Sequence, residues 1–465
     1  MEKELKEKLF NKKENGWKTV DTRQKEEIFK ISENYMKFLN QSKTEREFVK
    51  EARKLADSNG FKDIMEFSEL KPGDKIYFVN REKSMYLAII GEEPIENGMH
   101  IIGSHIDSPR LDLKPNPLYE DTELAYFKTH YYGGIKKYQW TTIPLSIHGV
   151  IVKTNGEKIE INIGEKETDP IFTITDLLPH LADEQMNKKL KNGIDGEDLN
   201  LLIGSIPYNE EDVTEKVKLN ILNILNQKYG ITEVDLTSSE LELVPAFKAR
   251  SLGFDEGMVA AYGQDDKVCA YTSLAAMMEL EKVKNTAVCI LSDKEEIGSM
   301  GNTGMESHMF DFFISEILNK LNINKPNLLD KVFCFSKMLS SDVDAGFDPI
   351  YASVSDKINA GFLGKGISLN KYTGARGKSG ASDANAEYVA WIRNILEKNE
   401  IKYQIAELGK VDIGGGGTIA YILANKGVDV IDCGVPVLSM HAPYEVTSKF
   451  DIYSAFKTYK AFWQE

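Results

Sequence analysis

The stretch 287–304, AVCILSDKEEIGSMGNTG, places two adjacent glutamates shortly after a run of apolar residues. The apolar residues 287–291 predict a buried β-strand that stops at Ser292. Glu295 and Glu296 then lie in a glycine-rich segment, which predicts an irregular turn. Because binding sites in α/β sheets gather where strands end, the stretch predicts a sheet together with a functional site at its edge.

Apolar strands alternate with helical stretches over the second half of the chain, which is typical of an α/β sheet with helical layers. The predicted elements are strands at AVCIL (287–291), KVFCF (331–335) and VDVIDCG (428–434), and helices at 268–283 and 381–399. Nearer the N-terminus, residues 22–58 predict helices because their apolar residues recur at helical spacing, and 99–109 predict a strand followed by a turn.

The middle of the chain differs from its flanks in composition and in the pattern of apolar residues. Residues 145–167 predict a β-hairpin, since two strand-like runs flank the turn formed by Asn155 and Gly156. A charged and polar stretch follows at 183–200. This change of composition predicts a second domain inserted into the first.

The composition fits a globular protein of two domains, since 465 residues exceed one ordinary core. The formal net charge of −15 disfavours nucleic acid and anionic membranes as partners. The four cysteines form no C-x-x-C pair and three lie in apolar runs, which favours reduced thiols and a cytoplasmic location. The first residues show no signal-peptide core, and no apolar run reaches the ~18 residues of a membrane span.

Carboxylates and histidines, the side chains that bind divalent metals, recur in short stretches that follow apolar runs. One such stretch carries little information, because an isolated Asp-Asp or Glu-Glu is usually a solvated turn. The ordered set is more specific. It comprises GSHIDSP (His105, Asp107), GQDDK (Asp265, Asp266), DKEEIGS (Glu295, Glu296), LSSDVDAG (Asp342) and LSMHAPYE (His441).

This ordered set resembles the dinuclear metallo-aminopeptidases, and most closely the aspartyl aminopeptidase family. The motifs H-x-D-S-P, D-x-E-E-[IV]-G-S, S-x-D and S-M-H occur in the family's order and spacing, and the resemblance covers nearly the whole chain. It implies a three-layer α/β/α metallopeptidase domain with a central mixed sheet, formed by residues 1–115 and 249–465. It also implies that residues 116–248 are an inserted, β-rich dimerisation domain.

The resemblance implies a site with two divalent ions, most simply zinc, with cobalt or manganese as alternatives. The first ion is expected to bind His105 and Asp342, the second to bind Glu296 and His441, and Asp265 to bridge both. A water molecule between the ions would attack the N-terminal peptide bond, with Glu295 as the general base. Asp107 is expected to orient His105, because a ligating histidine usually donates its other N–H to an acceptor.

The resemblance further implies an assembly with peptide substrates, a tetrahedral dodecamer built from dimers. His180 matches a family histidine that reaches a neighbouring subunit's active site and contacts the substrate near the metals. Gly415, Gly416, Gly417 and Thr418 match a loop that lines the pocket. The chain departs from the family at Ala345, Asp348 and Tyr444, where histidines and an arginine are usual, so the preference for acidic N-terminal residues is not expected to transfer.

Two other functions remain open at the level of sequence. An amidohydrolase or deacylase could use the same dinuclear site on a non-peptide amide. A non-catalytic oligomeric scaffold could retain a relic of the site, although the complete ligand set argues against it.

Overall fold

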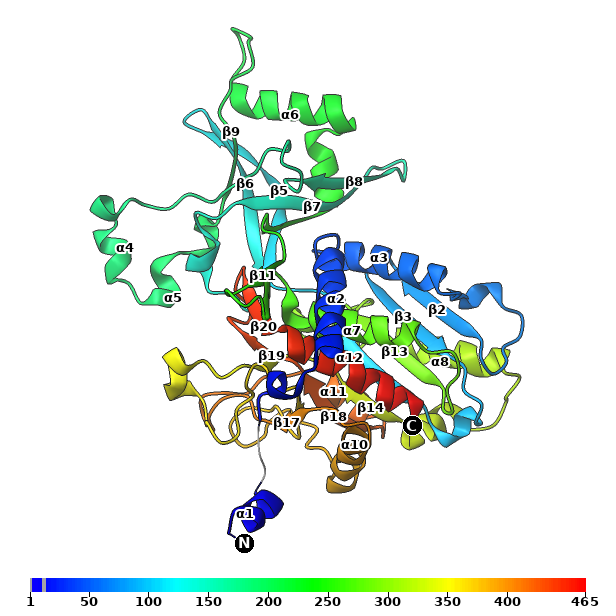
Figure 1. Cartoon of the computed structure of the whole chain (residues 1–465). Helices are drawn as coiled ribbons and strands as arrows, with labels where there is room; N and C mark the ends of the chain where they lie inside the picture. The colour runs from blue at the N-terminus through cyan, green and yellow to red at the C-terminus, as the bar shows by residue number, and fades with distance from the viewer. Residues whose placement is uncertain (1, 11–13) are drawn as a thin grey trace.

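The computed structural model describes residues 2–10 and 14–465. A mixed sheet of nine strands forms the centre of the main body (Figure 1). Its strands, in spatial order, are β1 (Lys62–Asp63), β2 (Lys75–Asn80), β3 (Ser84–Ile89), β13 (Ala287–Ser292), β4 (His100–His105), β14 (Lys337–Ser340), β18 (Asp429–Gly434), β16 (Ile367–Asn370) and β17 (Tyr403–Ile405).

Helices cover both faces of this sheet. One face packs against α2 (Thr22–Leu39), α3 (Glu45–Ser58), α7 (Gln264–Met278), α10 (Ala386–Lys398) and α12 (Lys449–Gln464). The other packs against α8 (Met309–Lys320), α9 (Leu328–Phe335) and α11 (Ala420–Ala424). Figure 1 shows α2, α7 and α12 crossing the face of the sheet that is turned toward the viewer.

The alternation of side chains along β13 shows why both faces need a helical layer. Cys289 and Leu291 lie in the core on the α7 face, whereas Val288 and Ile290 lie in the core on the α8 face. All four side chains are buried. A strand that is apolar on both faces is stable only between two layers, and the predicted three-layer α/β/α architecture is confirmed.

A separate six-stranded antiparallel sheet lies above the main body in Figure 1. Its order is β8 (Lys158–Ile163), β7 (Leu145–Val152), β10 (Ser239–Pro245), β5 (Arg110–Asp121), β6 (Leu124–Tyr132) and β9 (Leu201–Gly204). The sheet has its own apolar core around the buried Trp140, against which α6 (Lys216–Tyr229) packs. The predicted hairpin is confirmed as β7 and β8, and the polar stretch forms two short helices, α4 (Asp183–Asn187) and α5 (Leu190–Gly193).

A third sheet of five strands joins the two larger ones. Its order is β11 (Arg250–Leu252), β12 (Met258–Ala261), β20 (Glu445–Ser448), β19 (Pro436–Leu438) and β15 (Asp344–Ala345). Near the N-terminus, α1 (Glu2–Leu9) lies apart from the body in Figure 1. Among the described helices, none combines the length and apolar character needed to cross a membrane.

The predicted strand at 331–335 is wrong. These residues form the end of α9, and the strand β14 begins only at Lys337. Leu328 and Val332 are buried one helical turn apart, whereas Cys334 is exposed. A short apolar run does not distinguish a strand from a buried helical segment, and here the spacing of buried residues belongs to a helix.

His148 of β7 lies at the contact between the six-stranded sheet and α3. Its Nδ1 is 2.7 Å from Glu47 Oε1, and its Nε2 is 3.1 Å from Glu165 Oε1. Lys43 and Lys248 both pair with Glu165 at 2.5 Å. Burial alone lowers the pKa of His148, but the hydrogen bonds to Glu165 and Glu47 outweigh it and raise the pKa above its ordinary value.

We expect His148 to stabilise the protein in a pH-dependent way. Because its folded-state pKa is raised, the stabilisation is complete below the unfolded-state pKa of about 6.5 and is lost as the pH rises through the folded-state pKa. His148→Gln should therefore lower the free energy of unfolding by about 1.5–3 kcal/mol at pH 6. The loss should be smaller at pH 9. Urea unfolding of both proteins at the two pH values measures this, and an equal loss at both would contradict it.

Candidate metal centre and active site

Parallel strands of the nine-stranded sheet carry three of the predicted ligands to one edge. β4 ends at His105, β13 is followed by the turn with Glu296, and β14 is followed by Asp342. The other two predicted ligands come from elsewhere, Asp265 from the start of α7 and His441 from the loop between β19 and β20. The fold therefore brings together five side chains that are far apart in the sequence.

Asp265 is almost fully buried and lies between the two histidines. Its Oδ1 is 3.2 Å from His105 Nε2, and its Oδ2 is 3.2 Å from His441 Nε2. Two ligand atoms that each lie about 2.0–2.1 Å from a tetrahedral zinc ion are about 3.3 Å apart, so both separations suit a shared cation. A carboxylate that faces two such positions has the arrangement of a bridging ligand.

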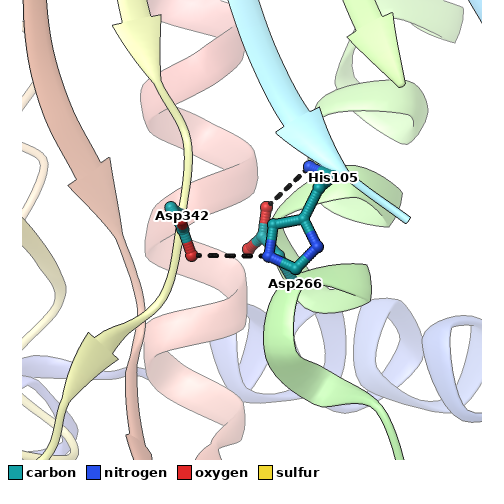
Figure 2. Close-up of side chains that lie close together, drawn as sticks. All are labelled: His105, Asp266 and Asp342. Carbon is teal, nitrogen blue, oxygen red and sulfur yellow. Dashed lines mark hydrogen bonds and ion pairs between the residues drawn. The ribbon is translucent and has the colours of Figure 1, made fainter. Parts of the chain in front are cut away.

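A second carboxylate accompanies each histidine. Asp342 Oδ1 lies 3.8 Å from His105 Nε2, and Glu296 Oε2 lies 3.7 Å from His441 Nε2. Figure 2 shows the Asp342 carboxylate directed toward the His105 ring. We call His105 with Asp342 the first half-site and Glu296 with His441 the second half-site, and the two share Asp265.

The ring of His105 is held in one orientation by Asp107. Its Nδ1 faces the backbone oxygen of Asp107 at 3.1 Å and the carboxylate Oδ1 at 3.3 Å. Both oxygens only accept hydrogen bonds, so Nδ1 carries a hydrogen and Nε2 is the nitrogen left to bind a metal ion beside Asp265. This is the contact expected of a residue that orients a metal-binding histidine.

The Asp107 carboxylate also holds the turn that carries the two glutamates. Its Oδ1 accepts the backbone N–H of Glu295, and its Oδ2 accepts that of Glu296, both at 3.2 Å. Lys294 and Gly298, which flank this turn, both have left-handed backbone conformations. This irregular backbone lets the N–H groups of Glu295 and Glu296 both donate to the Asp107 carboxylate.

The two adjacent glutamate side chains approach different histidines. Glu296 Oε2 lies 3.7 Å from His441 Nε2, whereas Glu295 Oε2 lies 3.8 Å from His105 Nε2. The two neighbouring carboxylates at the end of this strand thus point toward different histidines. One carboxylate belongs to the second half-site, and the other reaches the first half-site.

Burial and neighbouring charges move the carboxyl pKa values apart. Burial raises the pKa of Asp265, but hydrogen bonds with His105 and His441 outweigh it and leave the pKa below its ordinary value. Burial also raises the pKa of Glu295, to about 7, with the charges of Asp107 and Asp265 acting in the same direction against His105. A carboxyl group with a pKa near neutrality can accept and release a proton at physiological pH.

Asp266 forms an alternative group with His105 and Asp342, drawn in Figure 2. The candidate ligand atoms of these three residues lie within 4.8 Å of one another. However, Asp266 Oδ2 accepts the backbone N–H of His105 at 3.3 Å. Asp266 therefore contacts the peptide backbone beneath the site, whereas both oxygens of Asp265 face imidazole nitrogens.

The chemistry of the donor set fits divalent cations. Imidazole lone pairs and carboxylate oxygens face each other in a buried site, which is repulsive unless a proton or a metal ion lies between them. Glu296 Oε1 is buried and has no hydrogen-bond partner within the part of the chain that the structure describes. Nitrogen and oxygen donors in this combination suit zinc, and the oxygen-rich character also accommodates manganese or cobalt.

The other predicted site residues engage different partners. His180 is exposed on a short 3-10 helix (Pro179–Leu181) next to α4. In the glycine loop, Thr418 donates a hydrogen bond of 2.7 Å to the Asp432 carboxylate, and the Gly416 N–H donates to the backbone oxygen of Thr373 at 3.0 Å. These contacts organise the loop itself.

Sequence reasoning missed Glu445. Its Oε1 accepts the backbone N–H of His441 at 2.7 Å, and its Oε2 accepts that of Asp265 at 3.1 Å. One buried carboxylate thus fixes the backbones of a second-half-site residue and of the shared aspartate. The signal was present in the stretch HAPYE, where an acidic residue lies one short turn beyond the candidate histidine.

The fold and the site together define a metallohydrolase of the α/β/α class. A family model described as aminopeptidase I zinc metalloprotease (M18) matches residues 38–463. The chain belongs to this peptidase M18 family, and it is an aminopeptidase, a hydrolase of the zinc metalloprotease type. The resemblance inferred from the motifs is confirmed, and the comparisons support neither a deacylase nor a scaffold.

Similar proteins match over almost their whole length. The probable M18 family aminopeptidase 1 of Clostridium acetobutylicum is 53% identical, with 98% of each chain covered. The crystal structure of an M18 aminopeptidase from Thermotoga maritima has a TM-score of 0.94 at 45% identity, covering 98% of this chain and 100% of that one. The S. cerevisiae mApe1 dodecamer shares the fold, with a TM-score of 0.74 at 21% identity, covering 93% and 96%.

We expect the neighbouring aspartates to differ in their effect on metal binding. Asp265→Asn should lower the affinity for both ions, and by more than the 10–100-fold typical of residues behind the ligands. Asp266→Asn should keep both ions, because an amide oxygen can still accept the His105 N–H. Competition with a chromophoric chelator measures both variants. Loss of metal from Asp266→Asn as severe as from Asp265→Asn would contradict the bridging geometry.

Proposed function

We propose that the aminopeptidase works with two divalent ions per chain, most simply zinc. The observation that carries this proposal is the position of Asp265, whose two oxygens each lie 3.2 Å from a different histidine Nε2. Charge supports it, since two divalent ions supply +4 against the −3 of the shared aspartate and one carboxylate in each half-site. His105 and Asp342 would hold one ion, and Glu296 and His441 the other.

In this proposal Glu295 is the general base. When bound, the ions polarise the scissile carbonyl and acidify a water molecule. Glu295 accepts the proton of that water and passes it to the leaving amine, a role suited to a pKa of about 7. Asp107 keeps this carboxylate in place through the backbone N–H of Glu295, while its other contact fixes the His105 ring.

A substrate panel tests the activity against its nearest alternative. Aminoacyl-arylamides carry a free N-terminal amine, whereas N-acyl amino acids present a blocked one. The protein reconstituted with zinc, cobalt or manganese should hydrolyse the first class and not the second. The same panel, varied in the N-terminal side chain, identifies the preferred residue.

We further propose that residues 116–248 form a dimerisation domain inserted into a catalytic domain of residues 1–115 and 249–465. The separate core of the six-stranded sheet supports this division. Such dimers would assemble into a tetrahedral dodecamer, a homo-oligomer that admits peptides. The dodecameric S. cerevisiae mApe1, which shares the fold, supports this proposal. The four free cysteines fit a reducing cytoplasm.

We expect the adjacent glutamates to behave differently. Glu295→Gln should keep two ions per chain and lower kcat by roughly 10²–10⁴-fold with little change in KM, because only proton transfer is lost. Glu296→Gln should weaken one ion, and high zinc concentration should restore part of the activity. Metal content measured beside steady-state kinetics separates them. Indistinguishable behaviour of the two variants would refute the division of roles.

We expect His180 to act across a subunit boundary. His180→Ala should lower kcat/KM by about 10²-fold, as for removal of one hydrogen-bond donor at the reacting group, without changing metal content. The exposed His308 is the matched control, and His308→Ala should retain full activity.

Mixed oligomers test this role of His180 directly. In a mixture of His180→Ala with Glu295→Gln chains, an intact Glu295 can meet an intact His180 from its neighbour. Reassembled mixtures should therefore be more active than either variant alone. Activity no higher than the average of the two would place His180 in its own subunit's site or outside any site.

A further inference from the structure

The end of β6 and the two glycines that follow it reach from the six-stranded sheet into the metal centre. We call Tyr132, Gly133 and Gly134 the β6 tail. The Tyr132 hydroxyl donates a hydrogen bond of 2.8 Å to Asp107 Oδ2. The Gly134 backbone oxygen lies 2.7 Å from His441 Nδ1. Three consecutive residues thus border groups on which the candidate site depends.

Tyr132 controls the carboxylate that orients the glutamate turn. Asp107 Oδ2 accepts both the Tyr132 hydroxyl at 2.8 Å and the Glu296 N–H at 3.2 Å. Asp107 is completely buried, so its carboxylate has no solvent molecules to replace a missing donor. The tyrosine hydroxyl therefore fixes the rotation of the group that holds the Glu295 and Glu296 backbones.

The tyrosine ring is itself held in place by Arg110. The guanidinium carbon of Arg110 lies 4.0 Å from the centroid of the Tyr132 ring. Arg110 pairs with Asp112 at 2.7 Å and with the buried Glu45 and Glu242 at 3.3 Å each. Such a cation stacked on the ring leaves the hydroxyl little freedom to move away from Asp107.

Gly134 sets the state of the His441 ring. A carbonyl oxygen only accepts hydrogen bonds, so Nδ1 carries a hydrogen and Nε2 is the nitrogen left to bind a metal ion. That Nε2 is the atom that faces Asp265 and Glu296. The backbone of the β6 tail therefore prepares His441 as a ligand, as Asp107 prepares His105.

Gly133 allows the close approach between the tail and the second half-site. Its φ of +72° is a left-handed conformation that side chains disfavour. A Cβ at this position would lie 3.1 Å from Glu296 Oε2 and 3.4 Å from Glu296 Cβ. A side chain here would displace the carboxylate that completes the second half-site.

We propose that the β6 tail positions the second half-site, so that the six-stranded sheet contributes directly to the geometry of metal binding. This inference rests on the proposed assignment of Glu296 and His441 to one ion. The tail approaches both of these residues directly, whereas it reaches His105 of the first half-site only through Asp107. Tyr132, Gly133 and Gly134 are thus positioning residues that act through Asp107, Glu296 and His441.

The test is a cobalt(II) titration of metal-free protein, followed by absorbance. Tyr132→Phe removes one hydroxyl and keeps the ring. It should weaken the second-half-site cobalt equivalent by about 10–100-fold and the other by less, because Glu296 shares Asp107 Oδ2 with the hydroxyl, whereas His105 contacts Oδ1 and is also held by the Asp107 backbone oxygen. In the zinc enzyme kcat should fall while KM stays near its original value, because the hydroxyl is engaged with the buried Asp107.

Tyr131→Phe is the matched control. Tyr131 precedes Tyr132 on the same strand, and 43% of it is exposed. This variant should bind both cobalt equivalents as the original protein does. Gly133→Ala provides a second route to the same result, and it should also weaken one equivalent selectively. If circular dichroism shows that Tyr132→Phe does not fold, the cobalt titration of Gly133→Ala tests the inference in its place.

The outcomes separate this inference from the proposed function. An original protein that binds two equivalents, with Tyr132→Phe and Gly133→Ala unchanged from it, overturns the positioning role and leaves the metal assignment standing. Equal weakening of both equivalents also overturns selective positioning. An original protein that binds fewer than two equivalents overturns the metal assignment itself.

Discussion

Mutual repulsion of buried carboxylates is the constraint on which this site depends. The side chains of Asp265, Glu296 and Asp342 are largely buried and are gathered around two imidazole rings, of which that of His441 is partly exposed. Burial raises the pKa of Glu296 and of Asp342 well above the ordinary value, and the neighbouring charges of Asp265 and Asp266 act in the same direction. Such a group is stable only with protons or cations between its members, and the surrounding contacts hold the five side chains in this arrangement.

The two half-sites are held by different parts of the fold. The first is built from strand ends of the nine-stranded sheet, where parallel strands place their carboxyl ends at one edge. The second depends on loops, and its support comes from Glu445, Asp107 and the β6 tail. Because the tail continues a strand of the six-stranded sheet, a segment that resembles an assembly module also shapes the active site.

Much of this architecture was predictable from the sequence. The buried strand before Glu295, the hairpin around Gly156 and the helical layers followed from periodicity, and the candidate ligands that the family resemblance implied lie close together in the structure. The segment 331–335 failed because a short apolar run fits a strand or a buried helix equally well.

The supporting contacts were not predictable in the same way. Tyr132 lies in a run of aromatic residues with no motif around it, and its partner Asp107 lies 25 residues earlier, just after a strand of a different sheet. Gly134 acts through its backbone oxygen, which every residue type possesses, so the sequence carries no signal for that contact. Metal ligands come from a few residue types and can be recognised in the sequence by short motifs. The groups that orient the ligands can be recognised only from their positions in the structure.

The central claim is that Asp265 joins two cations, one with each histidine. Anomalous X-ray diffraction at the zinc absorption edge, on crystals grown with zinc, tests it most directly. The account predicts two anomalous peaks about 3.5–4 Å apart, on either side of the Asp265 carboxylate, one next to His105 and Asp342 and the other next to His441 and Glu296. A single peak enclosed by His105, Asp266 and Asp342, with none beside His441, would contradict it.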